Sequence, residues 1–211
     1  MINSPNTLNL AAFCSGTRTL GPGLRAAVWV QGCSKRCPDC ISPDWLSTQP
    51  NQLISPQSLA ERILANPDVS GITLSGGEPF LQPVPLIQLL RHLQNERFFD
   101  VICFTGFTLA EILSDPPAPG ALYLLDELDL LIDGPYIKSL NDGAGLRGSI
   151  NQRFQHLSPH FQHVDFTAWQ RNLELRISDG QAMLAGIPPA ALDQWFQTLS
   201  FEGSLPEGSA S

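Results

Sequence analysis

The sequence predicts an α/β fold in which helices pack outside a sheet of parallel strands. Two observations support this prediction. Short apolar runs, typical of buried strands, alternate along the chain with segments whose apolar residues recur at helical spacing. Repeated strand–helix units of this length join parallel strands and leave the helices outside the sheet. The 211 residues, 43% of them hydrophobic, can bury one sizeable core but do not promise two large domains.

Four strands are expected from the apolar runs. They are Leu24 to Val30, Gly71 to Ser75, Val101 to Phe104 and Leu128 to Ile132. Each run is followed by a loop that contains glycine and polar residues, which marks the end of the strand.

Three helices are expected between these strands. The first begins after Ser55, whose side chain can cap it, and ends at Asn66-Pro67. The second runs from about Pro85 to Gln94 and buries a face of leucines. The third begins at a capping box formed by Thr108 and Glu111.

Composition argues against several classes of function. The formal net charge is −8 and no run of Lys or Arg occurs, so a nucleic-acid-binding surface is not expected. No stretch approaches the ~20 apolar residues of a membrane span, and the N-terminus lacks the basic-then-apolar order of a secretion signal. We therefore expect a soluble, cytoplasmic protein that binds neither nucleic acid nor a membrane.

The residues best suited to chemistry follow the expected strands. In sheets of this kind, ligands bind where the carboxyl ends of the strands open into loops. Loop 33–40 follows the first strand, loop 75–79 the second, loop 105–107 the third and loop 133–136 the fourth. We therefore expect these four loops to meet at one edge of the sheet.

Three cysteines form the motif Cys33-x3-Cys37-x2-Cys40. Thiolate is the ligand that iron–sulfur centres select, so this loop can hold three corners of a four-iron cluster and leave the fourth iron open. A structural zinc site with Cys14 as the fourth ligand is an alternative, although paired C-x2-C spacings are more typical of zinc. Disulfides are not expected, because the cysteines number five and no signal peptide precedes them.

A pair of glycines ends the second strand, within Gly76-Gly77-Glu78-Pro79. Paired glycines let a backbone approach a ligand closely, and the adjoining carboxylate can accept hydrogen bonds from an ammonium group. Taken alone, this sequence is a common turn. Its place one strand after the three cysteines favours a ligand-binding loop.

Together these motifs resemble those of radical S-adenosylmethionine enzymes. Within that group, residues 8 to 154 resemble the activating proteins of anaerobic ribonucleoside-triphosphate reductases. The further motifs that carry this resemblance are, in order, Gly21-Pro22-Gly23-Leu24-Arg25, Gln31-Gly32-Cys33, Thr105-Gly106-Phe107-Thr108, Asp133-Gly134-Pro135-Tyr136 and Arg147-Gly148-Ser149-Ile150-Asn151-Gln152-Arg153. The last motif separates these activating proteins from other short radical enzymes.

The resemblance implies an incomplete (β/α) barrel, open on one side so that a large substrate can reach the cluster. It implies one [4Fe-4S] cluster and S-adenosylmethionine as cofactors, the second chelated to the open iron. Reduction would cleave the sulfonium to a 5′-deoxyadenosyl radical, which takes a hydrogen atom from a glycine of the partner. The implied partners are a glycyl-radical reductase or another protein substrate, and a flavodoxin- or ferredoxin-like reductant.

The resemblance also implies which residues hold the cofactors. The cluster ligands would be Cys33, Cys37 and Cys40. The adenine side of S-adenosylmethionine would lie, chiefly through backbone groups, along Asp39, Cys40 and Ile41. Its methionine end would lie at Gly76 and Gly77, with Glu78 nearby. Asp39 departs from the family, which often has glycine before the third cysteine, and from the aromatic residue of many radical S-adenosylmethionine enzymes.

Other candidate groups favour structural interpretations. Cys103 lies within an apolar strand and is expected to be a small buried hydrophobe. His156, His160 and His163 are irregularly spaced, which favours a solvated loop over a metal site. The acids of Asp126-Glu127-x-Asp129 are expected at a helix end and its exposed face, where a basic reductant could dock.

The resemblance ends near residue 154. We therefore expect a radical S-adenosylmethionine core at 1–154 and a C-terminal extension at 155–211, which would cover the open edge of the barrel or select a partner. Two alternatives stay open: a radical enzyme that acts on another protein or a small molecule, and a non-catalytic iron–sulfur protein for electron transfer or sensing. The glycine pair and Glu78 favour catalysis.

The extension has a β-hairpin pattern. Residues 172–178 alternate apolar and polar side chains, and Asp179-Gly180 offers a tight turn into residues 181–187. A short helix over about 192–199 and a disordered tail from Gly203 are expected to follow.

Overall fold

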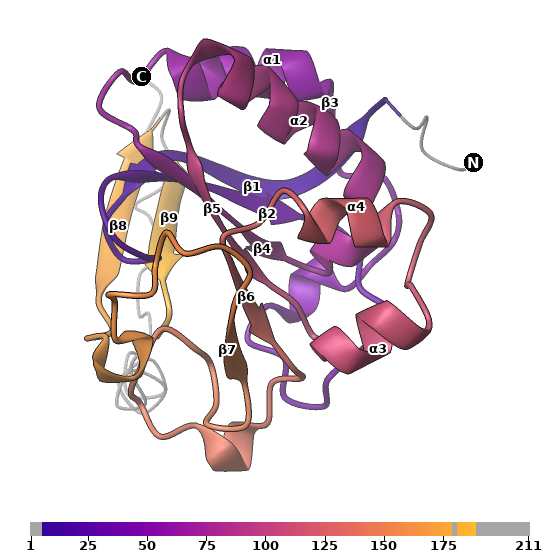
Figure 1. The fold of residues 1–211 in the computed structure, drawn as a ribbon, viewed down its shortest axis with the longest axis vertical. Helices are drawn as coiled ribbons and strands as arrows, with labels where there is room; N and C mark the ends of the chain where they lie inside the picture. Colours follow the sequence, from indigo (N-terminus) through magenta and orange to yellow (C-terminus); the bar gives the residue numbers. More distant parts are fainter. Residues whose placement is uncertain (1–5, 179–180, 189–211) are drawn as a thin grey trace, which may run out of the picture.

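The computed structural model describes residues 6–178 and 181–188 of the chain. Its main sheet has seven strands in the order β3-β1-β2-β4-β5-β6-β7, and a separate hairpin pairs β8 with β9 (Figure 1). The strands are β1 Leu8–Thr17, β2 Arg25–Val30, β3 Gln52–Ile54, β4 Gly71–Gly76, β5 Asp100–Phe104, β6 Leu130–Asp133, β7 Arg153–His156, β8 Leu173–Ser178 and β9 Gln181–Gly186.

The central strands β2, β4, β5 and β6 run parallel, and each lies within two residues of its expected bounds. Antiparallel strands extend the sheet on both sides, with β1 and β3 beyond β2, and β7 beyond β6. The sequence did not predict these three, because β3 and β7 are too short for a periodic signal and β1 mixes apolar with small and polar residues. Among the described residues the edge strands β3 and β7 do not pair, so the expected α/β class takes the form of an open, incomplete barrel.

Within the described ranges the chain forms four α-helices: α1 Pro56–Leu64, α2 Pro83–Glu96, α3 Leu109–Ser114 and α4 Ala121–Leu125. The Ser55 hydroxyl caps α1 by accepting the Ser58 N–H at 3.1 Å, and Thr108 and Glu111 form the expected capping box of α3. Helix α2 begins earlier than expected because Pro83 fits the first turn, where no backbone N–H is needed. Helix α4 was not predicted; it is only five residues long.

Neighbouring side chains on the central strands point to opposite faces of the sheet and build two hydrophobic cores. Helices α1 and α2 cover one face, which contains Val28 and Val101 (Figure 1). Ile102 lies on the other face, where it packs in one cluster with Phe161 and Phe166. Residues that follow β7 therefore complete the second core.

The expected hairpin is present, with β8 and β9 antiparallel and Ser178 opposite Gln181. The turn at 179–180, the helix expected over 192–199 and the tail expected from Gly203 lie outside the described residues.

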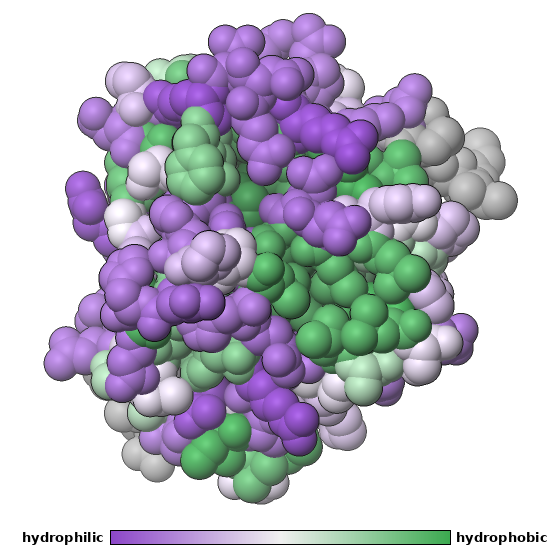
Figure 2. Space-filling view, viewed as in Figure 1, coloured by the Kyte–Doolittle hydropathy of each residue, from purple (hydrophilic) through white to green (hydrophobic). Residues whose placement is uncertain are grey.

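The surface carries an apolar area over α3 and α4, which Figure 2 shows in the same view as Figure 1. Leu113 of α3 is 59% exposed and Leu122 of α4 is 43% exposed, because these short helices cover the sheet with only part of their apolar residues. No helix in the described part of the chain is long and apolar enough to cross a membrane.

The acidic stretch after α4 agrees in part with its expected place. Asp126 is exposed and forms the C-cap of α4. Asp129 is half-buried instead, and its carboxylate accepts the Val101 N–H at 2.8 Å at the start of β5. Its role in the fold is therefore to join two strands rather than to face solvent.

Candidate functional site

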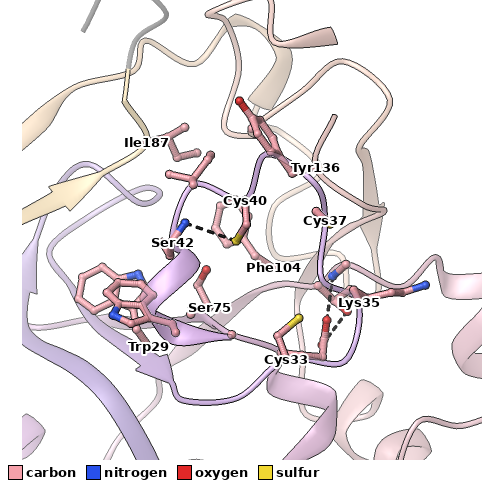
Figure 3. Close-up of a pocket in the computed structure, with 18 of the residues that line it drawn as sticks. Trp29, Cys33, Lys35, Cys37, Cys40, Ser42, Ser75, Phe104, Tyr136 and Ile187 are labelled. Carbon is pink, nitrogen blue, oxygen red and sulfur yellow. Dashed lines mark hydrogen bonds between the residues drawn. The ribbon is translucent and has the colours of Figure 1, made fainter. Parts of the chain in front are cut away.

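The carboxyl ends of the four parallel strands surround one pocket, where the predicted loops meet (Figure 3). Each strand contributes to its wall through the loop that follows it. The contributions include Cys33, Cys37 and Cys40 after β2, Gly77 and Glu78 after β4, Thr105 and Gly106 after β5, and Gly134 and Tyr136 after β6.

The cysteine loop brings all three of its thiols to this pocket. The Cys33 N–H donates to the Leu46 carbonyl at 3.2 Å, and the Cys40 N–H donates to the Cys37 carbonyl at 3.2 Å, so the loop is closed on itself and against the next segment. Cys33 is buried, whereas Cys37 and Cys40 are half-buried. Burial raises the pKa of the Cys33 thiol, so a metal must displace its proton in order to bind.

The three thiols match the ligand type of an iron–sulfur cluster, in which each thiolate binds a different iron. Across residues 6–178 and 181–188, no three His, Cys, Asp or Glu side chains are grouped closely enough to hold one metal ion. Cys14 does not support the zinc alternative, because it lies in β1, does not line the pocket and donates its S–H to the Gly16 carbonyl at 3.4 Å.

Gly76 and Gly77 form their part of the wall with backbone alone. A Cβ at Gly76 would lie 2.3 Å from the Val30 nitrogen, and a Cβ at Gly77 would lie 2.2 Å from the Gly32 carbonyl oxygen. Gly76 also has a φ of +109°, which favours glycine. The sequence attributed these glycines to space for a ligand; in the structure their missing side chains are also required by the close approach of β2 and β4.

Glu78 is fully buried beside the pocket. Its Oε1 accepts the Thr105 hydroxyl at 2.8 Å and the Phe80 N–H at 3.0 Å, and its Oε2 accepts the Gly106 N–H at 2.9 Å. Burial raises the pKa of Glu78 to about 7, against the effect of these hydrogen bonds. A cation bound beside such a carboxyl would favour its charged form near neutral pH.

Lys35 is a pocket residue to which the sequence analysis gave no role. It lies inside the cysteine motif, and its Nζ donates to Glu111 Oε1 at 2.9 Å. The same ammonium lies 4.2 Å from the centroid of the Phe107 ring. This ion pair joins the cysteine loop to the capping box of α3. Its position between Cys33 and Cys37 was the signal that could have singled it out.

Two of the three residues expected on the adenine side, Cys40 and Ile41, line the pocket. The Cys40 sulfur accepts the Ser42 N–H at 3.4 Å (dashed in Figure 3). Asp39 is exposed and does not line the pocket, so its assignment stays a prediction.

Other lining residues had no predicted role. Trp29 comes from β2, and Tyr136 and Gln152 come from motifs that carry the family resemblance. Ile187 follows β9 and lies far from those motifs, so a hairpin pattern alone could not place it in the pocket.

The residues expected to be structural behave so. Cys103 is fully buried in β5, and burial raises the pKa of its thiol well above the usual value. His156, His160 and His163 are exposed, as a solvated loop requires.

The family model for the 4Fe-4S single cluster domain matches residues 19–155, which contain every cluster and cofactor residue predicted above. The chain belongs to this family. With activating-enzyme relatives as well, it is a radical S-adenosylmethionine enzyme whose cofactors are a [4Fe-4S] cluster and S-adenosylmethionine.

Similar proteins include the anaerobic ribonucleoside-triphosphate reductase-activating protein of Vibrio cholerae, which is 32% identical over 142 residues, 63% of this chain and 87% of that protein. The pyruvate formate-lyase-activating enzyme of Clostridium pasteurianum is 32% identical over 92 residues, 41% of this chain and 39% of that enzyme. The crystal structure of QueE from Escherichia coli covers 60% of this chain and 70% of its own, with 14% identity and a TM-score of 0.43. The fold assignment therefore rests on the strand order described above.

Proposed function

We propose that this enzyme is an activase that generates a glycyl radical on an anaerobic ribonucleoside-triphosphate reductase. The observation that carries the proposal is one pocket that combines three thiols, the bare backbone of a glycine pair and a buried carboxyl. When bound and reduced, the cluster supplies the electron that cleaves S-adenosylmethionine to a 5′-deoxyadenosyl radical. The reductase-activating relatives support the choice of partner.

The proposed cluster ligands are Cys33, Cys37 and Cys40. Their loop follows β2 directly and is held by backbone hydrogen bonds, so it would hold three irons of a four-iron cluster and leave the fourth without a protein ligand. The ion pair between Lys35 and Glu111 holds the same loop against α3.

The proposed site for the methionine end is the backbone of Gly76 and Gly77. Glu78 lies next to it and would favour an ammonium group, because its pKa of about 7 falls when a cation approaches. The adenine side is proposed to lie along Asp39, Cys40 and Ile41, of which the last two line the pocket.

The remaining proposals concern partners and organisation. A flavodoxin- or ferredoxin-like protein would supply the electron, and the protein would act in the cytoplasm. Residues 1–154 would form the core that carries the cluster chemistry, and residues 155–211 an extension that covers the open edge or selects the partner. The end of the family match at residue 155 supports this division.

Anaerobic reconstitution with iron and sulfide tests the cluster ligands. The wild-type chain should bind about four irons, as one four-iron cluster requires. Cys37→Ala should lose the cluster, whereas the matched variant Cys14→Ala should keep it, because Cys14 does not line the pocket. Stoichiometric zinc without iron, or an unchanged cluster in Cys37→Ala, would overturn the assignment.

Reduction of the reconstituted protein with S-adenosylmethionine tests the activity. We expect 5′-deoxyadenosine together with a glycyl radical in electron spin resonance, the latter only when the reductase is present. Cleavage without a glycyl radical would point to another protein or a small molecule as substrate. Absence of cleavage by a protein that holds its cluster would point to electron transfer or sensing instead.

A further inference from the structure

The hairpin β8–β9 is fixed to the connection between β1 and β2. The Arg18 N–H donates to Glu174 Oε1 at 3.1 Å, and the Thr19 hydroxyl donates to the Ala185 carbonyl at 3.0 Å. Gly186 has a φ of +133°, and a Cβ there would lie 2.2 Å from the Asn172 carbonyl oxygen. The close contact with the Asn172 backbone therefore fixes the backbone conformation at Gly186, where the chain leaves the hairpin.

This conformation takes the end of the hairpin into the pocket. Gly186, Ile187 and Pro188 line the same space as the three cysteines. Ile187 is only 8% exposed and packs in one cluster with Leu20 and Trp29. In Figure 3 its side chain lies beside the Cys40 segment, on the side away from Tyr136. These residues lie outside the family match, which ends at residue 155.

Near Tyr136 the pocket wall includes Gly134, Gly148 and Gln152. Gln152 Nε2 donates to the Gly134 carbonyl at 2.9 Å, and its Oε1 accepts the Gly148 N–H at 2.7 Å. A Cβ at Gly148 would lie 2.9 Å from Tyr136 Cδ2, so no side chain fits there. The whole pocket, which includes the cysteine loop and the glycine pair, has a volume of about 180 Å³.

We infer that Ile187 is a positioning residue, which narrows the pocket on one side and holds there the extended peptide segment that carries the reacting glycine. The inference rests on the proposed function. In this arrangement the branched apolar side chain of Ile187 contacts the segment from one side of the pocket. One hydrogen atom then moves from that Cα to the 5′ carbon, giving 5′-deoxyadenosine and a glycyl radical.

The test compares Ile187→Ala with Leu184→Ala in the reconstituted, full-length enzyme. Leu184 is a fair control because it lies in β9, three residues before Ile187, is 46% exposed and does not line the pocket. The first readout is the ratio of 5′-deoxyadenosine to glycyl radical on the reductase. This ratio should rise about tenfold in Ile187→Ala, which is the size of effect expected when a pocket loses apolar contact with its substrate. It should stay at the wild-type value in Leu184→Ala.

The second readout is the rate at which a soluble iron chelator removes iron from the cluster, which requires no partner. It should increase in Ile187→Ala and remain unchanged in Leu184→Ala. If Ile187→Ala does not take up a cluster, Ile187→Val replaces it and should change both readouts in the same direction.

Equal ratios and equal chelation rates in the Ile187 and Leu184 variants would overturn the inference. If even the wild-type protein gives no glycyl radical while it cleaves S-adenosylmethionine, the proposed partner is wrong. The chelation rates then decide whether Ile187 closes the pocket, so the two failures are distinguished.

Discussion

Glu78 makes the stability of the cluster-free protein depend on pH. Burial raises the pKa of this carboxyl from 4.5 to about 7, so the folded state holds the proton more tightly than the unfolded chain does. Proton binding at Glu78 therefore stabilises the folded state fully below about pH 4.5, and this stabilisation is lost as the pH rises through about 7. Between pH 5 and 8, the free energy of unfolding should fall by on the order of 3 kcal/mol more in the wild type than in Glu78→Gln. Denaturant titrations at several pH values measure this difference, and parallel pH profiles would contradict it.

Gly77 gives a second prediction at the scale of single residues. Because a Cβ there would lie 2.2 Å from the Gly32 carbonyl oxygen, even Gly77→Ala should push the cysteine loop away from β4. We expect lower iron content after reconstitution as well as weaker binding of S-adenosylmethionine. Gly106→Ala is a milder control, since its Cβ would lie 3.1 Å from the flexible Lys35 side chain and 3.5 Å from Glu78 Oε2, with no backbone atom among these nearest neighbours. Full iron content in Gly77→Ala would show that the strand ends can separate without cost.

At the scale of elements, Arg171 holds loop 141–148, whose Gly148 lines the pocket. It donates to the Asn141 side chain at 2.7 Å, to the Ala144 carbonyl at 2.9 Å and to the Gly145 carbonyl at 3.1 Å. Arg171→Ala should therefore lower the free energy of unfolding by about 2 kcal/mol, through loss of buried hydrogen bonds to a charged group. It should also speed trypsin cleavage after Arg147, which lies in the freed loop.

The matched control for this loop is Arg176→Ala. The Arg176 side chain is 46% exposed and pairs with Glu174, so its removal should have little effect on stability or on cleavage after Arg147. Similar cleavage rates in the two variants would show that the loop is held by other contacts.

At the scale of the whole molecule, the region after β7 is part of the core. Phe161 and Phe166 are each 2% exposed and pack on Ile102 and its neighbours. Phe166→Ala should cost about 3–5 kcal/mol of unfolding free energy, because it leaves a cavity on this face of the sheet. Phe98→Ala, at a position 66% exposed, should cost less than about 0.5 kcal/mol. Equal costs in denaturant titrations would mean that this region packs only loosely.

Local patterns in the sequence determined the centre of this protein. The apolar runs predicted β2, β4, β5 and β6 because strands buried on both faces need uninterrupted hydrophobic side chains. The spacing of Cys33, Cys37 and Cys40 and the neighbouring glycine pair predicted an iron–sulfur pocket, since those ligands lie on loops at one sheet edge. The Asp179-Gly180 turn signal between alternating segments predicted the hairpin β8–β9.

Only the tertiary structure determined which residues distant in the sequence contact these central strands and loops. Strands β1, β3 and β7 exist through pairing with neighbours and carry little periodic signal of their own. The burial of Glu78, and with it its raised pKa, depends on Thr105 and Gly106 of another loop. Ile187 reaches the pocket because Thr19 and Glu174 fix the hairpin. Sequence periodicity reports contacts within one element, whereas these features depend on contacts between elements.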